Sequence, residues 1–305
     1  MTKLTLALDW TPNVNHIGFL IGKELGFYNK QDIDLEILNP KDDNYSMTPG
    51  KKLELNLADF AIAPFETVIS LNNKANKVQA VAIYAVLQRD LSCIVTLNSS
   101  TITKPKLLDG KTYASYKARY EDHIVNEMIK NDGGKGDLNI IYPEKLGIWN
   151  TLLSGKADAT WIFDNWEGIE ASGKNIELNK FYLADFQIPY GYSPTVLTKK
   201  ENLAKQNKLY SKFIKATQTG FLYAKNNLTE ATEILSRYVT AYDHTNVDLE
   251  KAISFSVPYF GDESTCGIME QERVLNFTKW LVDRGLEDKA ILNQRLFTNE
   301  LFENN

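Results

Sequence analysis

The stretch that decides the fold is LTLALDWTPNVNHIGFLIGKELGFYNKQDIDLEIL, residues 4–38. Residues 4–8 alternate leucine with threonine or alanine, which predicts a short buried strand. The apolar residues that follow recur at helical spacing up to Gly26, which predicts a helix that ends at this glycine. Residues 33–38 alternate again and predict a second strand. Strand, helix and strand in this order form a right-handed βαβ unit, which opens an α/β domain.

Polar and aromatic residues follow the first of these strands directly, in the loop DWTPN at residues 9–13. Ligands of open α/β sheets bind just beyond such strand ends, so this loop is a candidate binding segment. Asn15 is expected to cap the helix. For His16 two alternatives stay open: its imidazole could bond a ligand, or it could serve as part of the helix cap.

Composition bounds the class of protein. The chain has 305 residues, of which 43% are hydrophobic and 24% charged, as in an ordinary globular protein of one large or two medium domains. The formal net charge is -5, so the chain lacks the basic footprint of a nucleic-acid-binding protein. We therefore expect no nucleic acid among its partners.

Catalytic and metal-binding signatures are missing from the sequence. Cys93 and Cys266 are far apart and form no CxxC motif, so we expect two unpaired, buried thiols. His16, His123 and His244 do not stand at metal-ligand spacing, which disfavours a zinc site. No GxSxG, Walker or GxGxxG pattern occurs, so the common hydrolase and nucleotide-binding motifs are excluded. We expect no cofactor.

The beginning of the chain does not read as a signal peptide, because the apolar run over residues 4–10 is short and already polar at Asp9. No apolar run reaches the roughly 18 residues of a membrane-spanning helix. Taken as written, the sequence predicts a cytoplasmic protein. A leader that was removed and replaced by Met1 would make it extracytoplasmic, either periplasmic or lipid-anchored, and both alternatives stay open.

The remaining chain predicts two lobes. Strands are expected at 55–63 and 78–86, after a polar loop at 39–52, and a second block of strands and helices begins near residue 91. From residue 195 onward a short strand is followed by helices alone, and a helical tail without a new sheet must pack on an existing one. We therefore predict one lobe of residues 1–90 and 195–305, a second lobe of residues 91–194, and two crossovers that act as hinges. The tail helices are expected at 209–223, 231–238, 249–255 and 272–284.

A weak internal repetition relates the two blocks. Residues 49–67 and 154–168 share Gly-Lys, then Ala-Asp at the opening of a strand, then a polar and aromatic strand end with a glutamate that starts a helix. Two copies of one unit would place two strand-end loops face to face across a cleft.

Aromatic, amide and carboxylate side chains gather at the expected strand ends. This composition suits a small planar heterocycle, because aromatic rings can stack on it. Amides and carboxylates match its ring nitrogens and amino groups. Trp161 and Phe163 are expected in the core instead. Lys117 opens a helix and could hold a phosphate or formyl oxygen there, or lie in solvent. The candidate ligand-binding residues are Asp9, Trp10, Asn15, His16, Tyr45, Pro64, Glu66, Lys117, Tyr120, Asp164, Asn165, Trp166, Glu167, Tyr190 and Tyr192.

Four motifs carry a family resemblance: DWTPNVNHIG (9–18), NWEGIEA (165–171), IPYGYSP (188–194) and LFTNELF (296–302). In this order, and across essentially the full chain, they resemble the pyrimidine-precursor-binding family of thiamine metabolism. That family includes substrate-binding proteins of thiamine-precursor ABC transporters and the fungal hydroxymethylpyrimidine phosphate synthases. The resemblance implies the α/β type II periplasmic-binding-protein fold, with a ligand held between two lobes.

The two branches of this family differ at positions that the sequence can address. The resemblance implies that a synthase, which consumes pyridoxal phosphate and a histidine, carries a lysine and a histidine after the Ala-Asp strand and a cysteine-rich motif near the return crossover. The matching places here are Ala63 and Thr67, and residues 190–194 contain no cysteine. The transport branch fits better.

We therefore expect a monomeric, non-enzymatic binding protein for a small aminopyrimidine, with the membrane permease of an ABC transporter as partner. Two alternatives stay open: a cytoplasmic synthase-like enzyme of thiamine biosynthesis, and the same fold with another ligand such as riboflavin or a sulfonate.

Overall fold

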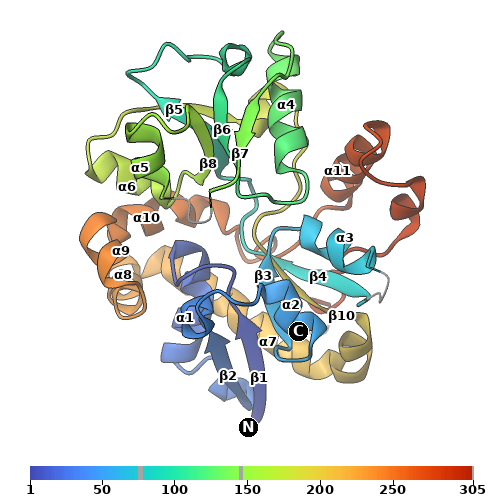
Figure 1. The fold of residues 1–305 in the computed structure, drawn as a ribbon. Helices are drawn as coiled ribbons and strands as arrows, with labels where there is room; N and C mark the ends of the chain where they lie inside the picture. Colours follow the sequence, from blue (N-terminus) through green and yellow to red (C-terminus); the bar gives the residue numbers. More distant parts are fainter. Residues whose placement is uncertain (75–77, 144–146, 304–305) are drawn as a thin grey trace. The chain divides into compact units, whose positions relative to one another are not determined.

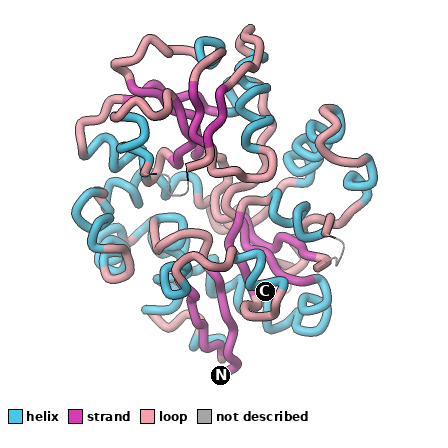
Figure 2. Tube along the Cα trace, viewed as in Figure 1, coloured by secondary structure: helices cyan, strands magenta, loops and turns pink. Residues whose placement is uncertain are grey.

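A computed structural model describes residues 1–74, 78–143 and 147–303, and the chain separates into two compact units. Unit 1 consists of Met1–Asp90 and Gly191–Asn305, and unit 2 consists of Leu91–Tyr190. Each unit has its own five-stranded sheet with helices packed around it (Figures 1 and 2). The chain thus leaves unit 1 after Asp90 and returns to it at Gly191.

The sheet of unit 1 has the strand order β2-β1-β3-β10-β4. β1 pairs in parallel with both β2 and β3, whereas β10 runs antiparallel to β3 and β4. Helix α1 (Ile17–Glu24) joins β1 to β2, so the predicted βαβ unit of residues 4–38 is confirmed, with Gly26 in the left-handed region just after the helix. The strands are β1 (Thr2–Ala7), β2 (Ile33–Leu38), β3 (Phe60–Ala63), β4 (Ala80–Ala85) and β10 (Thr195–Lys199).

The residue that caps the entry to α1 is Asn13, and the prediction of Asn15 was wrong. A single 3-10 turn (Val14–His16) precedes the α-helix, so the cap lies two residues earlier than expected. The Asn13 side chain accepts a hydrogen bond from the backbone N–H of Asn15 at 2.9 Å. Asparagine at this position satisfies an N–H that the first turn leaves without a partner.

Residues 39–63 differ from the prediction of a loop followed by one long strand. Helix α2 (Pro49–Glu54) replaces the end of the loop, and the strand is confined to β3. The Thr48 hydroxyl accepts from the backbone N–H of Lys51 at 3.2 Å, and Pro49 takes the first helical position, where its missing N–H costs nothing. Asn56, with φ of 58°, then turns the chain away from the helix.

The long helix α7 (Lys200–Asn226) packs against α1 at a glycine contact. A Cβ atom added to Gly220 would lie 2.0 Å from the carbonyl oxygen of Gly18. Beside this contact the Phe19 and Phe221 rings pack edge to face, with their centroids 5.2 Å apart. The two backbones approach so closely only because both side chains are hydrogen atoms.

The helices of unit 1 after α7 follow the predicted order, with one addition. The prediction missed the short helix α9, whose residues show no buried apolar stripe. The remaining helices of unit 1 are α3 (Glu66–Asn72), α8 (Leu228–Ser236), α9 (Ala241–Asn246), α10 (Leu249–Ser256) and α11 (Gln271–Asp283).

The sheet of unit 2 has the order β7-β6-β8-β5-β9, with β5 antiparallel to its neighbours β8 and β9. β9 was not predicted. Cys93, Val95 and Ile162 form a buried core with Trp149 and Ala171 from two helices. The elements are β5 (Ser92–Leu97), β6 (Thr112–Ala114), α4 (Glu121–Asn131), β7 (Asn139–Ile141), α5 (Ile148–Leu153), β8 (Ala159–Phe163), α6 (Glu167–Gly173) and β9 (Leu178–Tyr182).

Among the described residues, no helix combines the length and the apolar character that a membrane crossing needs.

Candidate functional site

Three residues just after β1 form a hydrogen-bonded chain. The backbone N–H of Asn13 donates to Nδ1 of His16 at 3.1 Å, and Nε2 of His16 lies 2.8 Å from Oδ1 of Asp9. Because Nδ1 accepts, the ring carries its proton on Nε2, which donates to the carboxylate. His16 is fully buried, whereas 27% of the Asp9 side chain is exposed. Asp9 is therefore held from the interior and reaches the surface.

Trp10, which follows Asp9 in the chain, forms an exposed aromatic pair with Tyr45. Trp10 is 49% exposed and Tyr45 is 50% exposed. Their ring centroids are 5.7 Å apart and their planes are inclined by 51°. Most large apolar side chains of this protein are buried, and water-exposed aromatic rings that touch each other are a feature of ligand sites. The pair offers two ring faces to a flat molecule.

The loop that carries Tyr45 is fixed by local contacts. Tyr45 has φ of 59°, and its backbone N–H donates to the carbonyl of Pro40 at 2.8 Å. The Lys52 ammonium lies 2.8 Å from Asp43 and holds the pKa of that carboxyl below its usual range. Lys52 itself is buried, so this ion pair ties the loop to helix α2.

The other candidates of unit 1 lie at the starts of helices. Asn15 and Glu66 are both only 5% exposed, and Glu66 is the first residue of α3. Pro64 is half-buried at the end of β3. The backbone N–H of Phe65 donates to the carbonyl of Tyr192 at 2.9 Å, which joins this strand end to the segment before β10.

Tyr192 is packed inside unit 1. Its side chain is 1% exposed, its hydroxyl accepts from the backbone N–H of Glu270 at 2.8 Å, and the guanidinium of Arg273 lies 4.0 Å from its ring centroid. Arg273 also donates to the carbonyls of Gln88 and Gly191. Arg273 therefore joins the two segments of unit 1 that lead to and from unit 2. No sequence pattern indicated this residue, because its hydrogen-bond partners are main-chain carbonyls.

In unit 2 the strand end of β6 is organised by Glu121, a residue that was not predicted. Its carboxylate accepts from the Tyr113 hydroxyl at 2.7 Å and from the backbone N–H groups of Tyr116 and Ala118 at 3.0 and 3.1 Å. Burial raises the pKa of Glu121 despite these hydrogen bonds. The two backbone donors around Lys117 therefore bind a carboxylate of the protein itself.

Lys117 and Tyr120 flank this carboxylate. Lys117 is exposed, has φ of 62°, and places its ammonium 5.4 Å from the centroid of the Tyr142 ring. Tyr120 is 2% exposed, and its hydroxyl accepts from Nε of Arg119 at 2.8 Å. Lys117 is thus open to solvent and Tyr120 is not.

The predicted residues after β8 face inward. The Asp164 carboxylate accepts hydrogen bonds from the Lys180 ammonium and the Tyr182 hydroxyl, both on β9. Asn165 and Trp166 are buried with it. Glu167 is half-buried and turns back to accept from the backbone N–H of Phe163 at 2.9 Å.

Tyr190 closes unit 2 at its last residue. It is 9% exposed and meets Trp161 edge to face, with ring centroids 5.5 Å apart. Trp161 and Phe163 were expected in the core, but both are half-buried. The two rings form an aromatic contact between the middle of β8 and the last residue of unit 2.

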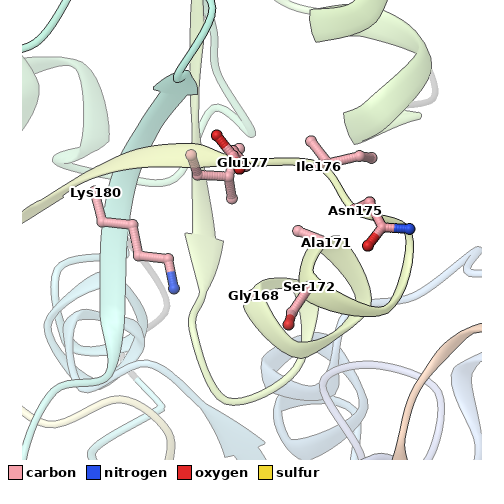
Figure 3. Close-up of a pocket in the computed structure, with 8 residues that line it drawn as sticks. Gly168, Ala171, Ser172, Asn175, Ile176, Glu177 and Lys180 are labelled. Carbon is pink, nitrogen blue, oxygen red and sulfur yellow. The ribbon is translucent and has the colours of Figure 1, made fainter.

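A hollow of 290 Å³ lies in unit 2 between α6 and β9. Figure 3 shows Ala171 and Ser172 on the helix, and Ile176 and Glu177 on the segment that runs into the strand. Lys180 connects this hollow with Asp164, through the hydrogen bond described above. The lining of this hollow contains none of the predicted ligand residues.

The candidates differ in exposure. Trp10, Tyr45 and Lys117 are exposed, Asp9, Pro64 and Glu167 are half-buried, and the other candidates are buried. The described residues include no group of three histidine, cysteine, aspartate or glutamate side chains that could hold a metal ion.

Two α/β units, each a five-stranded sheet with polar and aromatic strand ends, define the periplasmic-binding-protein fold. The alkanesulfonate-binding protein SsuA of Xanthomonas axonopodis pv. citri superimposes with a TM-score of 0.70 at 9% identity, over 98% of each chain. The nitrate-binding protein NrtA of Synechocystis PCC 6803 also gives 0.70, at 12% identity, over 99% of this chain and 88% of its own. The predicted fold class is confirmed.

The chain belongs to the NMT1/THI5-like family, whose model matches residues 13–231. A Haemophilus influenzae protein whose name places it in thiamine biosynthesis is 21% identical, over 95% of this chain and 89% of its own. A 4-amino-5-hydroxymethyl-2-methylpyrimidine phosphate synthase of Legionella pneumophila is 24% identical over 92% and 87%. The formylaminopyrimidine-binding protein of Halalkalibacterium halodurans is 24% identical over 82% and 73%. The predicted family resemblance is confirmed.

Proposed function

We propose that this protein binds a small aminopyrimidine precursor of thiamine and delivers it to the permease of an ABC importer. The observation that carries this proposal is the exposed Trp10 and Tyr45 pair, together with the partly exposed carboxylate of Asp9, which precedes Trp10 in the chain. The two rings supply stacking faces, and the carboxylate supplies an acceptor for an amino group. The relative from Halalkalibacterium halodurans, named for binding a formylaminopyrimidine, supports this ligand class.

This role has consequences for location and assembly. A binding protein that serves an importer works outside the cytoplasm. The aliphatic sulphonate-binding protein SsuA of Escherichia coli and the nitrate-binding protein NrtA, which have a similar fold, are both named as periplasmic. We propose an extracytoplasmic monomer. Stability of the ligand complex would come from stacking and from a few placed polar groups rather than from a cofactor.

Mass spectrometry of the protein purified under non-denaturing conditions tests this proposal. The expected result is a complex whose extra mass equals the mass of an aminopyrimidine, such as 4-amino-5-hydroxymethyl-2-methylpyrimidine or a formylaminopyrimidine. Release of an alkanesulfonate, a flavin or another metabolite would contradict the ligand class and leave the fold unaffected. A protein purified empty is to be titrated with the same compounds.

The second candidate function is that of a pyrimidine phosphate synthase, which the name of the Legionella pneumophila relative favours. The residues argue against it: Ala63 is buried and Thr67 is half-buried at the places where a synthase of this family resemblance carries its lysine and histidine. Neither side chain can bond pyridoxal phosphate covalently. Addition of pyridoxal phosphate is therefore expected to give no absorbance band of a lysine-bound form, and a stable band at one equivalent would favour the synthase.

A further inference from the structure

Two hydrogen bonds link Asn13 to His16 and His16 to Asp9, and the backbone donor of Asn13 determines the direction of both. A backbone N–H can only donate, so Nδ1 of His16, 3.1 Å from the Asn13 nitrogen, can only accept. The ring proton must then lie on Nε2, 2.8 Å from Oδ1 of Asp9. The backbone thus determines the tautomer of a fully buried imidazole, and the imidazole determines which carboxylate oxygen it holds.

The second oxygen of Asp9 is left for a ligand. Across residues 1–74, 78–143 and 147–303, no side chain or backbone group donates a hydrogen bond to Oδ2 of Asp9. The side chain is 27% exposed although its other oxygen is bonded to a buried ring. An ionised carboxylate oxygen accepts and cannot donate. Asp9 directly precedes Trp10 in the chain, and Trp10 belongs to the exposed aromatic pair.

We infer that Asp9 selects ligands that present an amino N–H at this strand end, and that His16 is the positioning residue that keeps the accepting oxygen of Asp9 outward. This inference rests on the proposed function, because it specifies which edge of the heterocycle the site reads. A ligand with only acceptor atoms at that edge would leave two oxygens facing each other without a proton, which is costly when both are removed from water.

Asp9→Asn tests this inference because the fixed histidine also determines how the new amide must lie. The His16 Nε2–H requires an acceptor, so the amide oxygen takes the place of Oδ1 and the NH₂ group takes the place of Oδ2. The reverse orientation would point two donors at each other, and Asn13 prevents the histidine from changing its tautomer. The group offered to the ligand changes from acceptor to donor with almost no change in shape.

The experiment measures the dissociation constants of 4-amino-5-hydroxymethyl-2-methylpyrimidine and its 4-methoxy analogue by calorimetry, for the wild type and for Asp9→Asn. The methoxy oxygen stands where the amino group was and carries no proton. We expect the wild type to prefer the amino compound by about tenfold or more, and the variant to lose or invert that preference. Asn175→Ala, at the hollow of unit 2, is the control and should keep the wild-type preference.

A second measurement needs no substitution at the site. Two-dimensional ¹⁵N NMR of the histidine rings should show His16 as the Nε2–H tautomer, and His123→Gln and His244→Gln assign the other two signals, since both of those side chains are exposed. An Nδ1–H tautomer at His16 would overturn the inference. Wild-type binding with an unchanged preference in Asp9→Asn would overturn it as well while leaving the proposed function intact. Failure of the wild type to bind either pyrimidine would overturn the proposed function and the inference together.

Discussion

Trp10 and Tyr45 stand 35 positions apart in the sequence, yet their rings lie with centroids 5.7 Å apart, and each is about half exposed. Trp10 follows the first strand, and Tyr45 lies in a loop that is held in place by the ion pair between the buried Lys52 and the half-buried Asp43. Because these two rings contact each other at the surface, they lack the full burial that stabilises most aromatic side chains in this protein. We propose that these rings stack on the ligand, which would account for their position.

Replacement of Trp10 by alanine should weaken aminopyrimidine binding by about 2–4 kcal/mol, because one stacked anchor is lost. Thermal unfolding should change little, since half of the ring is already in water. Calorimetry of the variant against the wild type measures the loss. Tyr242→Ala, a substitution of another exposed ring in helix α9, is the control and should bind as the wild type does. Equal affinities of Trp10→Ala and Tyr242→Ala would remove Trp10 from the site.

Gly220→Ala should destabilise unit 1 by about 3 kcal/mol, because the added Cβ would lie 2.0 Å from the Gly18 carbonyl oxygen and the helices α1 and α7 must separate. Urea unfolding followed by circular dichroism measures the effect. Lys212→Ala changes an exposed position of the same helix and serves as the control. A Gly220→Ala protein as stable as Lys212→Ala would show that the close crossing is wrong.

Both thiols should resist modification in the folded protein. Cys93 and Cys266 are fully buried and form no disulfide. Burial raises the pKa of Cys266 to about 11, so almost none of this thiol is present as thiolate at pH 8. Ellman's reagent should react with neither cysteine before unfolding and with both in concentrated guanidinium chloride. Rapid reaction of one thiol in the native protein would show that its surroundings open in solution.

The turn after helix α10 should contribute to the acid sensitivity of unit 1. Hydrogen bonds from Ser264 and Thr265 to the Asp262 carboxylate hold its pKa at about 2. The pKa of Asp262 is lower in the folded protein than in the unfolded chain. Ionised Asp262 therefore stabilises the fold at pH values above its unfolded-state pKa, and this contribution is lost as the pH falls toward 2.

Melting temperatures of the wild type and Asp262→Asn, measured from pH 5 down to pH 2, test this linkage. The wild type should melt higher at pH 5, and the difference should shrink as the pH falls, because the variant has no carboxylate to protonate at this position. A difference that stays constant over this range would mean that ionised Asp262 contributes nothing specific.

The sequence predicts the strands and helices of residues 4–38 well because their apolar periodicity matches their burial. It fails at residues 39–63, where Leu55 and Leu57 suggest a strand but are about half exposed at 48% and 49%. The capping pair Thr48 and Pro49 was the signal for a helix there.

The strand-end residues of the candidate site were predicted by type but not by orientation. Asp9 and Trp10 reach the surface, whereas Asp164 turns inward to Lys180 on a strand that was itself not predicted. Glu121 could not be identified from spacing, because its role depends on the loop that brings backbone N–H groups to its carboxylate. Side-chain direction at a strand end is decided by such tertiary partners and not by local pattern.

The central claim is tested most directly by calorimetric titration of the ligand-free wild type. The ligands are 4-amino-5-hydroxymethyl-2-methylpyrimidine and a formylaminopyrimidine, with an alkanesulfonate and nitrate for comparison. The account predicts saturable binding of one molecule of an aminopyrimidine per chain, with neither anion competing. Saturable binding of the sulfonate or nitrate, with no heat from either pyrimidine, would contradict it.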